Sequence, residues 1–189
     1  MLAGHNDCSV SSSPERRQRF ESLASLVFDP LQRYLRRRLD PEDASDVLSE
    51  TLLVVWRRLD EVPKDNPLPW CYGVARRAAA NQRRSRRRHL RLVERIERER
   101  PTPTVEPGFD DPVLEAAFDG LSESDRELLR LWAWEGLEPR EIATVLGLTV
   151  NATTLRLSRA RKKLAAEMTR QDPIAAGQKT VRHTKEQQQ

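Results

Sequence analysis

The sequence predicts an all-α protein made of two small helical domains joined by a proline-rich linker. Apolar residues recur with a helical period in several stretches, and no stretch of any length alternates in the manner of a β-strand. Prolines cluster between residues 100 and 112 and interrupt this period. The chain has 189 residues, of which 38% are hydrophobic and 33% charged. This composition suits small helical modules with much surface better than one large enzyme core.

The same patterns predict the domain boundaries. We expect a disordered N-terminus over residues 1–15, a first helical domain over 16–99, the linker over 100–112, a second helical domain over 113–169 and a disordered tail over 170–189. The serine-rich start and the glutamine-ended tail lack the apolar period of a packed helix.

The first domain is expected to begin with two helical stretches. Apolar residues recur at helical spacing over residues 20–35, and Pro30 leaves open whether they form one helix or two. Asp40 followed by Pro41 is typical of a helix start, and this helix is expected to run to about Leu59. Its apolar stripe contains Val47, Leu48, Leu52, Val55 and Leu59.

A third helical stretch, from Trp70 to about Val93, changes character along its length. Prolines before it exclude helix from the preceding loop. Its first half places small or apolar residues inward, namely Trp70, Val74, Ala75 and Ala78. From Arg83 onward the stretch is strongly basic.

The second domain carries helix starts and stops at short intervals. Ser122 is expected to cap a helix, with Asp125 in the third position of a weak capping box. Gly136 can take the left-handed conformation that ends this helix, Pro139 begins a short helix, and Gly147 closes it. The core side of the first of these helices is expected to contain Leu128, Leu129, Leu131 and Trp132.

A last helix is expected after Thr149, its N-cap residue. Its core side contains Val150, Thr153, Leu157, Ala160 and Leu164. Its outer face is polar and basic and contains Asn151, Thr154, Leu155, Arg156, Ser158, Arg159, Arg161 and Lys162. A short helix, a glycine turn and such a second helix form the motif that enters the DNA major groove. A three-helix bundle with a solvated basic face is the alternative.

Two charged surfaces of the first domain are further candidates for binding. Asp43, Asp46 and Glu50 share one helical face, which could engage an arginine-rich partner or be merely solvated. Arg83, Arg84, Arg86, Arg87 and Arg88 form a basic stripe suited to the phosphates of a displaced DNA strand. Arginine far outnumbers lysine in the chain, which favours nucleic-acid binding, although a genome rich in G and C produces the same bias.

Other classes of protein find little support. Cys8 and Cys71 belong to no Cys/His cluster, so neither a zinc site nor a disulfide framework is expected. His5, His89 and His183 are scattered, without a nucleophile or phosphate loop. No segment approaches the roughly 20 apolar residues of a membrane span. We therefore expect a cytoplasmic protein that is not an enzyme, with no catalytic residues, cofactor, metal, membrane insertion or small-molecule substrate.

Both predicted domains resemble those of a known family. The second domain is similar to region 4 of the sigma-70 family of RNA polymerase sigma factors through LSESDRELLRLWAWEGLEPREIATVLGLTVNATTLRLSRARKKL. The first domain is similar to region 2.2 through DPEDASDVLSETLLVVWRRL, and to regions 2.3 and 2.4 through PWCYGVARRAAANQRRSRRR. Because no third domain fits into the linker, the chain is identified as a member of the extracytoplasmic function (ECF) subfamily.

The resemblance implies a sigma factor that directs promoter-specific transcription initiation. Its partners would be core RNA polymerase, promoter DNA and, as is usual in this family, an anti-sigma protein. The implied polymerase-binding residues are Asp43, Asp46, Ser49 and Glu50. The implied minus-10 residues are Arg76, Asn81, Arg83, Arg84, Arg86, Arg87 and Arg88. The implied minus-35 residues are Asn151, Thr154, Leu155, Arg156, Ser158, Arg159 and Arg161.

The chain departs from the family at several of these positions. Asn81 stands where aspartate is frequent, Ser49 where glutamine is frequent, and VNATTLR where a VGTVKSR-like start is usual. These departures leave the promoter sequence open. The alternatives are an autonomous helix-turn-helix regulator, which would bind duplex DNA by itself, and a helical adaptor that binds polymerase or an anti-sigma protein without initiating.

Overall fold

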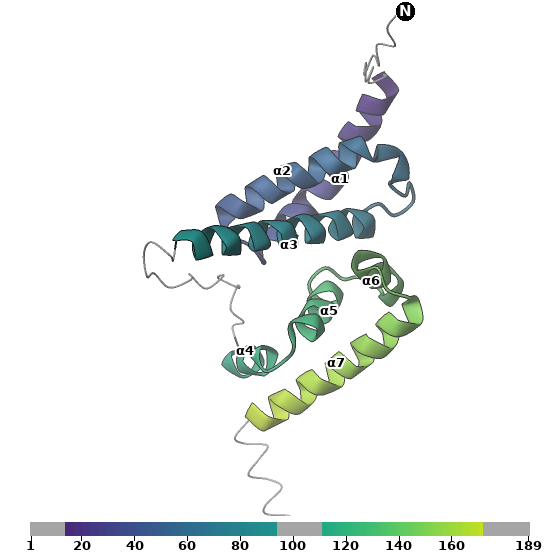
Figure 1. Ribbon diagram of the computed structural model, residues 1–189. Helices are drawn as coiled ribbons and strands as arrows, with labels where there is room; N and C mark the ends of the chain where they lie inside the picture. Colours follow the sequence, from purple (N-terminus) through teal and green to yellow (C-terminus); the bar gives the residue numbers. More distant parts are fainter. Residues whose placement is uncertain (1–13, 94–110, 172–189) are drawn as a thin grey trace, which may run out of the picture.

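The computed structural model describes residues 14–93 and 111–171, with side chains over 14–88 and 111–171. These residues form seven α-helices and one short 3-10 helix, and no strand occurs among them, which confirms the all-α prediction (Figure 1). The predicted N-terminal segment, linker and tail lie almost wholly outside the described residues. Helices extend slightly into all three, since α1 begins at Pro14, α4 begins at Pro112 and α7 ends at Gln171.

The first unit contains α1 (Pro14–Arg36), α2 (Pro41–Arg57), the 3-10 helix η1 (Leu59–Glu61) and α3 (Leu68–Val93). Pro30 lies inside α1 without ending it, so the first stretch is one helix. Asp40 occupies the N-cap position of α2, as predicted, but its carboxylate makes no cap hydrogen bond and instead contacts Arg86.

The helices of the first unit pack around one apolar core. α2 lies against both α1 and α3. The buried side chains of α1 are Val27, Leu31, Tyr34 and Leu35. Of the predicted stripe of α2, Val47, Leu48, Val55 and Leu59 are buried, and Leu52 is half-buried. The predicted inward residues of α3 are buried except Trp70, which is half-buried beneath the guanidinium of Arg58.

The second unit contains α4 (Pro112–Asp119), α5 (Glu123–Ala133), α6 (Pro139–Leu146) and α7 (Val150–Gln171). The predicted helix signals act as expected. The Ser122 hydroxyl accepts a hydrogen bond from the backbone N–H of Asp125 at 3.2 Å. Gly136 and Gly147 both have φ of +67°, a conformation that side chains other than glycine adopt at a cost.

Two predicted core residues of this unit are in fact exposed. Trp132 is 39% exposed, and its ring is covered by the guanidinium of Arg161 at 4.6 Å from the ring centroid. Val150, the first residue of α7, is 48% exposed. The predicted core residues Thr153, Leu157 and Ala160 are buried.

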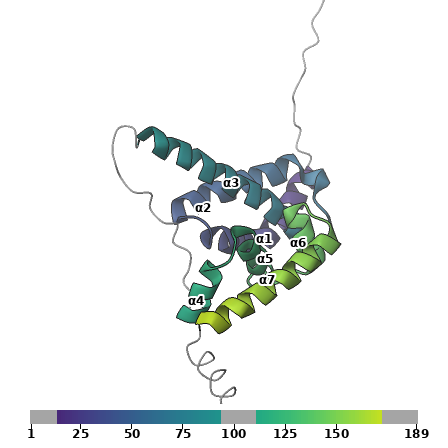
Figure 2. The same ribbon diagram turned by 60° about the horizontal axis from the view of Figure 1, so that its bottom comes forward.

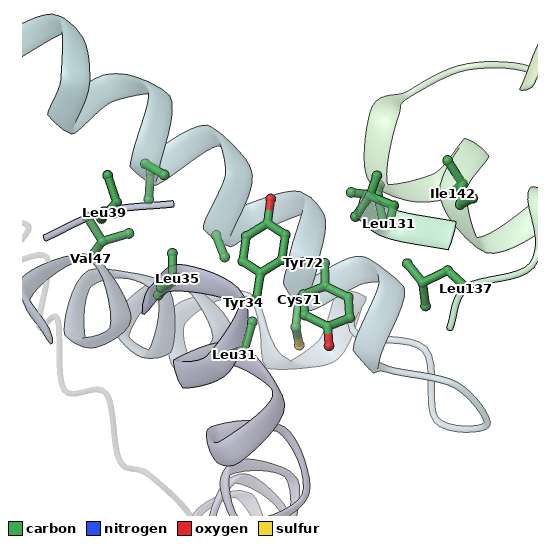
Figure 3. Packing of buried hydrophobic residues seen from close by; sticks show 14 of the residues in the cluster. Leu31, Tyr34, Leu35, Leu39, Val47, Cys71, Tyr72, Leu131, Leu137 and Ile142 are labelled. Atoms are coloured by element: carbon green, nitrogen blue, oxygen red, sulfur yellow. The ribbon is translucent and has the colours of Figure 1, made fainter. Parts of the chain in front are cut away.

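The two units pack directly on each other, and their buried apolar residues form one continuous cluster. α6 lies beside the first half of α3 (Figures 1 and 2). Figure 3 shows Leu131, Leu137 and Ile142 of the second unit on the side of α3 that carries Tyr72. The core therefore extends across both units.

Candidate nucleic-acid and polymerase interfaces

The outer face of α7 forms one open surface. All the residues predicted to contact the minus-35 element are exposed there, while Thr153, Leu157 and Ala160 anchor the opposite face. The turn before α7 is fixed by Gly147 and by Thr149, whose hydroxyl accepts a hydrogen bond from the backbone N–H of Ala152 at 3.3 Å. This geometry is that of a helix-turn-helix whose second helix is free to enter a groove.

Two contacts from α5 hold α7 in place, and the sequence did not indicate either. Lys163 Nζ donates to Asp125 Oδ2 at 2.6 Å. This hydrogen bond lowers the pKa of the Asp125 carboxyl below its usual value, against the opposing effect of burial. The stacking of Arg161 on Trp132 fixes one of the predicted minus-35 arginines against α5.

The arginines in the basic half of α3 differ in their contacts, although the sequence there is basic throughout. Arg83 Nη2 donates to the carbonyl oxygen of Arg38 at 2.7 Å, and Arg86 contacts both Asp40 and Asp43. Arg84 Nη2 donates to Asn81 Oδ1 at 2.6 Å, and both residues stay exposed. The remaining members of the predicted minus-10 set, Arg76, Arg87 and Arg88, are also exposed.

The predicted polymerase-binding residues of α2 likewise include exposed side chains and one that is paired within the protein. Asp46, Ser49 and Glu50 are exposed along one face. Asp43 is half-buried and accepts hydrogen bonds from Gln82 and Arg86, both at 2.9 Å. Asp43 therefore joins the acidic surface of α2 to the basic half of α3.

A buried cluster of charges connects the two units, and no pattern in the sequence predicts it. Arg38, in the turn after α1, is 5% exposed, and its guanidinium donates to Glu127 at 3.2 Å and to Glu135 at 3.1 Å. Arg37 donates to Glu135 at 2.9 Å. These partners lie 89 to 98 positions apart in the chain, so helical spacing could not have revealed them.

The same cluster contains Tyr34, whose hydroxyl donates to Glu127 at 3.3 Å. Burial, followed by the neighbouring carboxylate of Glu127, raises the pKa of Tyr34 well above its usual value. Burial lowers the pKa of Arg38, but Tyr34, Glu127 and Glu135 together outweigh it and keep the pKa of Arg38 raised. The phenol therefore stays protonated and the guanidinium stays charged at neutral pH.

Two clefts lie where the units meet. One, of about 670 Å³, has Arg76, Asn81 and Arg84 of α3 on one wall and Glu123 and Glu127 of α5 on the other. The second, of about 440 Å³, is lined by Arg76 together with Arg156, Arg159 and Lys163 of α7. Predicted minus-10 and minus-35 residues thus face shared spaces.

Over the described ranges, no group of three or more acidic, histidine or cysteine residues is arranged to hold a metal ion. None of the helices in those ranges is long and apolar enough to cross a membrane.

Family models match both units of the chain. The model for sigma-70 region 2 matches residues 20–89, and the model for sigma-70 region 4 matches residues 113–164. The RNA polymerase sigma factor NccH of Alcaligenes xylosoxydans xylosoxydans is 30% identical over 135 residues, which cover 66% of this chain and 72% of that protein. The ECF RNA polymerase sigma factor EcfG of Rhodopseudomonas palustris is 29% identical over 128 residues, which cover 65% of this chain and 70% of that protein.

Solved structures show the same fold. The sigma factor RpoE in complex with the anti-sigma factor NepR from Bartonella quintana matches with a TM-score of 0.58 and 23% identity, covering 79% of this chain and 96% of that chain. CnrH in complex with the cytosolic domain of CnrY matches with a TM-score of 0.54 and 26% identity, covering 79% of this chain and 87% of that chain.

Proposed function

Because the chain belongs to the sigma-70 family, as an extracytoplasmic function RNA polymerase sigma factor, we propose how its surfaces divide the work of promoter-specific initiation. The second unit holds the minus-35 element, the basic half of α3 holds the minus-10 element, and α2 docks on core polymerase. The observation that carries this division is the separate exposure of the three predicted surfaces on α7, α3 and α2.

On α7, the first three turns present the residues that contact base edges. Arg156 and Arg159 are long, exposed and positively charged, so they suit guanine edges or phosphates. Thr154 and Leu155 are exposed beside them, and Leu155 suits contact with a thymine methyl group. Arg161, held by Trp132, contributes a fixed backbone contact.

On α3, the exposed arginines neutralise the phosphates of the strand that is displaced when the minus-10 region opens. Opening DNA costs a few kcal/mol for each unstacked step, and backbone contacts offset that cost. Asn81 is oriented by Arg84, so its amide is fixed for contact with an unstacked base. Melting by binding energy in this way needs no catalytic group, and we propose that the protein has no enzymatic activity of its own.

On α2, Asp46 and Glu50 form the docking surface for positively charged groups of core polymerase. They lie four positions apart on the exposed face, one turn of helix from each other. Asp43 has a different role. It accepts hydrogen bonds from Arg86 and Gln82, and these bonds keep the polymerase surface next to the minus-10 surface.

The relatives of known structure suggest a further partner. RpoE and CnrH each form a complex with another protein, described as an anti-sigma factor for RpoE and as the cytosolic domain of CnrY for CnrH. We propose that this chain also binds an anti-sigma protein, and that it acts in the cytoplasm, where core polymerase and promoter DNA are found.

Runoff transcription with purified core polymerase, on templates from the protein's own upstream region, tests the proposal. The natural chain should produce specific transcripts, and an Asp46→Ala/Glu50→Ala variant should produce at least tenfold fewer. The matched control is Glu15→Ala/Glu21→Ala, which removes two exposed acids from α1 and should leave the transcripts unchanged. Tight binding to duplex DNA with no polymerase binding and no transcript would instead identify an autonomous regulator.

A further inference from the structure

The larger of the two clefts carries more positive charge than its own glutamates can neutralise. Its volume is about 670 Å³, and it is lined by five arginines and two glutamates, Glu123 and Glu127. Glu127 already accepts a hydrogen bond from one of these arginines, Arg38, at 3.2 Å. Glu123 pairs with Arg126, which lies outside the lining, at 3.3 Å. Within the lining, most of the positive charge therefore has no counter-charge.

The other four arginines of the cleft have no carboxylate partner among the described residues. Arg83 and Arg84 each donate a hydrogen bond to a neutral oxygen of the protein. Arg76 and Arg77 are exposed and have neither a hydrogen bond nor an ion pair with a described residue. A guanidinium presents a planar fork of donors that matches the oxygens of a phosphate group. Several guanidiniums around one cleft therefore favour a ligand that carries phosphate.

Two buried nitrogen atoms of residues that line the cleft have no acceptor in the described part of the chain. Arg38 is 5% exposed, and its Nη2 has no hydrogen-bond partner, although its Nε and Nη1 donate to glutamates. The Nε of Arg83 is also buried and without a partner. A hydrogen bond of 2.7 Å from Arg83 Nη2 to the carbonyl oxygen of Arg38 joins the two residues. Buried donors of charged groups are costly to leave unpaired, so an acceptor from outside the chain would stabilise both.

The size and lining of the cleft indicate a small ligand with several phosphates. Binding sites for small molecules have volumes of about 300–1,000 Å³, a range that includes this cleft. Its apolar lining is limited to Tyr34, Ala79 and Ala80, which offer little surface to a nucleobase. Exposed side chains rotate within nanoseconds, so movement of Arg77 or Arg84 gives an anion access to the buried donors.

We propose that the larger cleft is a binding site for a small polyphosphate. Arg76, Arg77 and Arg84 attract the anion, and Arg38 and Arg83 supply the two buried donors. The ligand is a free solute, so the site goes beyond the function proposed above. Because Arg76, Arg83 and Arg84 also belong to the minus-10 set, a bound polyphosphate competes with promoter DNA. This competition, unlike the site itself, rests on the proposed function.

Isothermal titration calorimetry of the full-length chain with inorganic tripolyphosphate, in magnesium-free buffer of constant ionic strength, tests the site directly. We expect one tripolyphosphate per chain, bound at least about tenfold more tightly than orthophosphate, because several guanidiniums contact one ligand. ATP should bind within about threefold of tripolyphosphate, because the cleft offers its base few apolar contacts. Binding of ATP without binding of tripolyphosphate would overturn the assignment to phosphate groups.

A pair of matched variants tests whether the cleft, rather than the basic surface in general, binds the ligand. Arg76→Gln/Arg77→Gln should weaken tripolyphosphate binding by about tenfold, since it removes two of the cations that line the cleft. Arg87→Gln/Arg88→Gln removes the same charge from exposed positions of α3 outside the lining, and its affinity should stay within about twofold of the natural chain.

A second pair tests the buried donors. Arg83→Lys keeps the positive charge but removes the Nε donor, so it should weaken tripolyphosphate binding by about fivefold. Arg86→Lys is its control, because Arg86 lies on the same helix outside the lining of the cleft. Circular dichroism establishes folding, and the pair of glutamine variants decides the result if Arg83→Lys loses its helices.

An equal loss of affinity in both glutamine variants, or several weak sites on each chain, would overturn the site in favour of general attraction to a basic surface. Failure of the folded natural chain to bind tripolyphosphate would overturn it as well. The calorimetry contains no DNA, so its result does not depend on the proposed promoter surfaces. Displacement of a fluorescein-labelled forked duplex by tripolyphosphate tests the competition, and runoff transcription without polyphosphate tests the promoter surfaces separately.

Discussion

Several charged residues have surroundings in the structure that differ from those that their sequence pattern predicts. Arg38 belongs to a run of arginines in the turn after α1, where a solvated position is the ordinary expectation, yet it is buried among carboxylates of the other unit. Asp43 belongs to an acidic face but is paired with Arg86. In both cases the partner comes from a distant helix, so tertiary packing determines the role of the side chain.

At the residue scale, the pair of Asp125 and Lys163 makes the stability of the second unit depend on pH. The lowered pKa of Asp125 means that folding favours its charged form. The stabilisation is complete above the ordinary aspartate pKa of about 3.9 and is lost as the pH falls through the lowered value. Asp125→Asn should therefore reduce the free energy of unfolding by about 1 kcal/mol at pH 7.

Urea unfolding between pH 7 and pH 3 measures this difference, which should shrink below about pH 4. Asp119→Asn is the control, because Asp119 is 69% exposed and its ion pair with Arg126, at 3.3 Å, is longer and more solvated. A constant difference between the natural chain and Asp125→Asn over the whole range would contradict this account of the pair.

Arg156 and Arg159 allow a second prediction at the residue scale. Each alanine substitution should weaken promoter binding by the holoenzyme by about 1–3 kcal/mol if the arginine contacts guanine. A phosphate contact would instead reduce the salt dependence of binding by about one unit for each arginine. Arg170→Ala, in the last turn of α7, is the control and should bind as the natural chain does. Unchanged binding by both variants would remove α7 as the minus-35 surface.

At the scale of elements, the local signals were sufficient to find most helices. Caps, prolines and glycines act over three or four residues, which is why Ser122, Pro139 and Gly147 predicted helix ends that the structure confirms. α4 carried too few apolar repeats to be predicted as a helix, although Asp111 caps it through the backbone N–H of Val113 at 2.9 Å. Trp132 and Val150 were assigned to the core wrongly. Helical periodicity indicates which face of a helix is apolar, but it does not show how deeply neighbouring helices cover each residue of that face.

The glycine that separates α6 from α7 gives a prediction at this scale. Gly147 has φ of +67°, so Gly147→Ala should destabilise the second unit by about 1–2 kcal/mol and weaken promoter binding by displacing α7. Gly73→Ala, within a regular helix, should be neutral or stabilising by up to about 1 kcal/mol. Thermal unfolding compares the two, and equal effects of both substitutions would contradict the role assigned to the turn.

At the scale of the whole molecule, the sequence predicted two helical units and the order of their surfaces but not their contact. The family resemblance predicts binding surfaces on α2, α3 and α7, and most of their residues are exposed in the structure. The packing of the two units on each other depends on pairs such as Arg38 and Glu135, separated by 97 positions. No local pattern relates residues so far apart in the sequence, so a single sequence does not predict that they will be in contact.

Footprinting of the upstream DNA, with and without core polymerase, tests the central claim most directly. With core polymerase, we expect protection near the minus-35 element and permanganate-reactive thymines near the minus-10 element. The protein alone should give neither signal. Strong protection of the duplex by the protein alone, with no reactive thymines after core polymerase is added, would contradict the account.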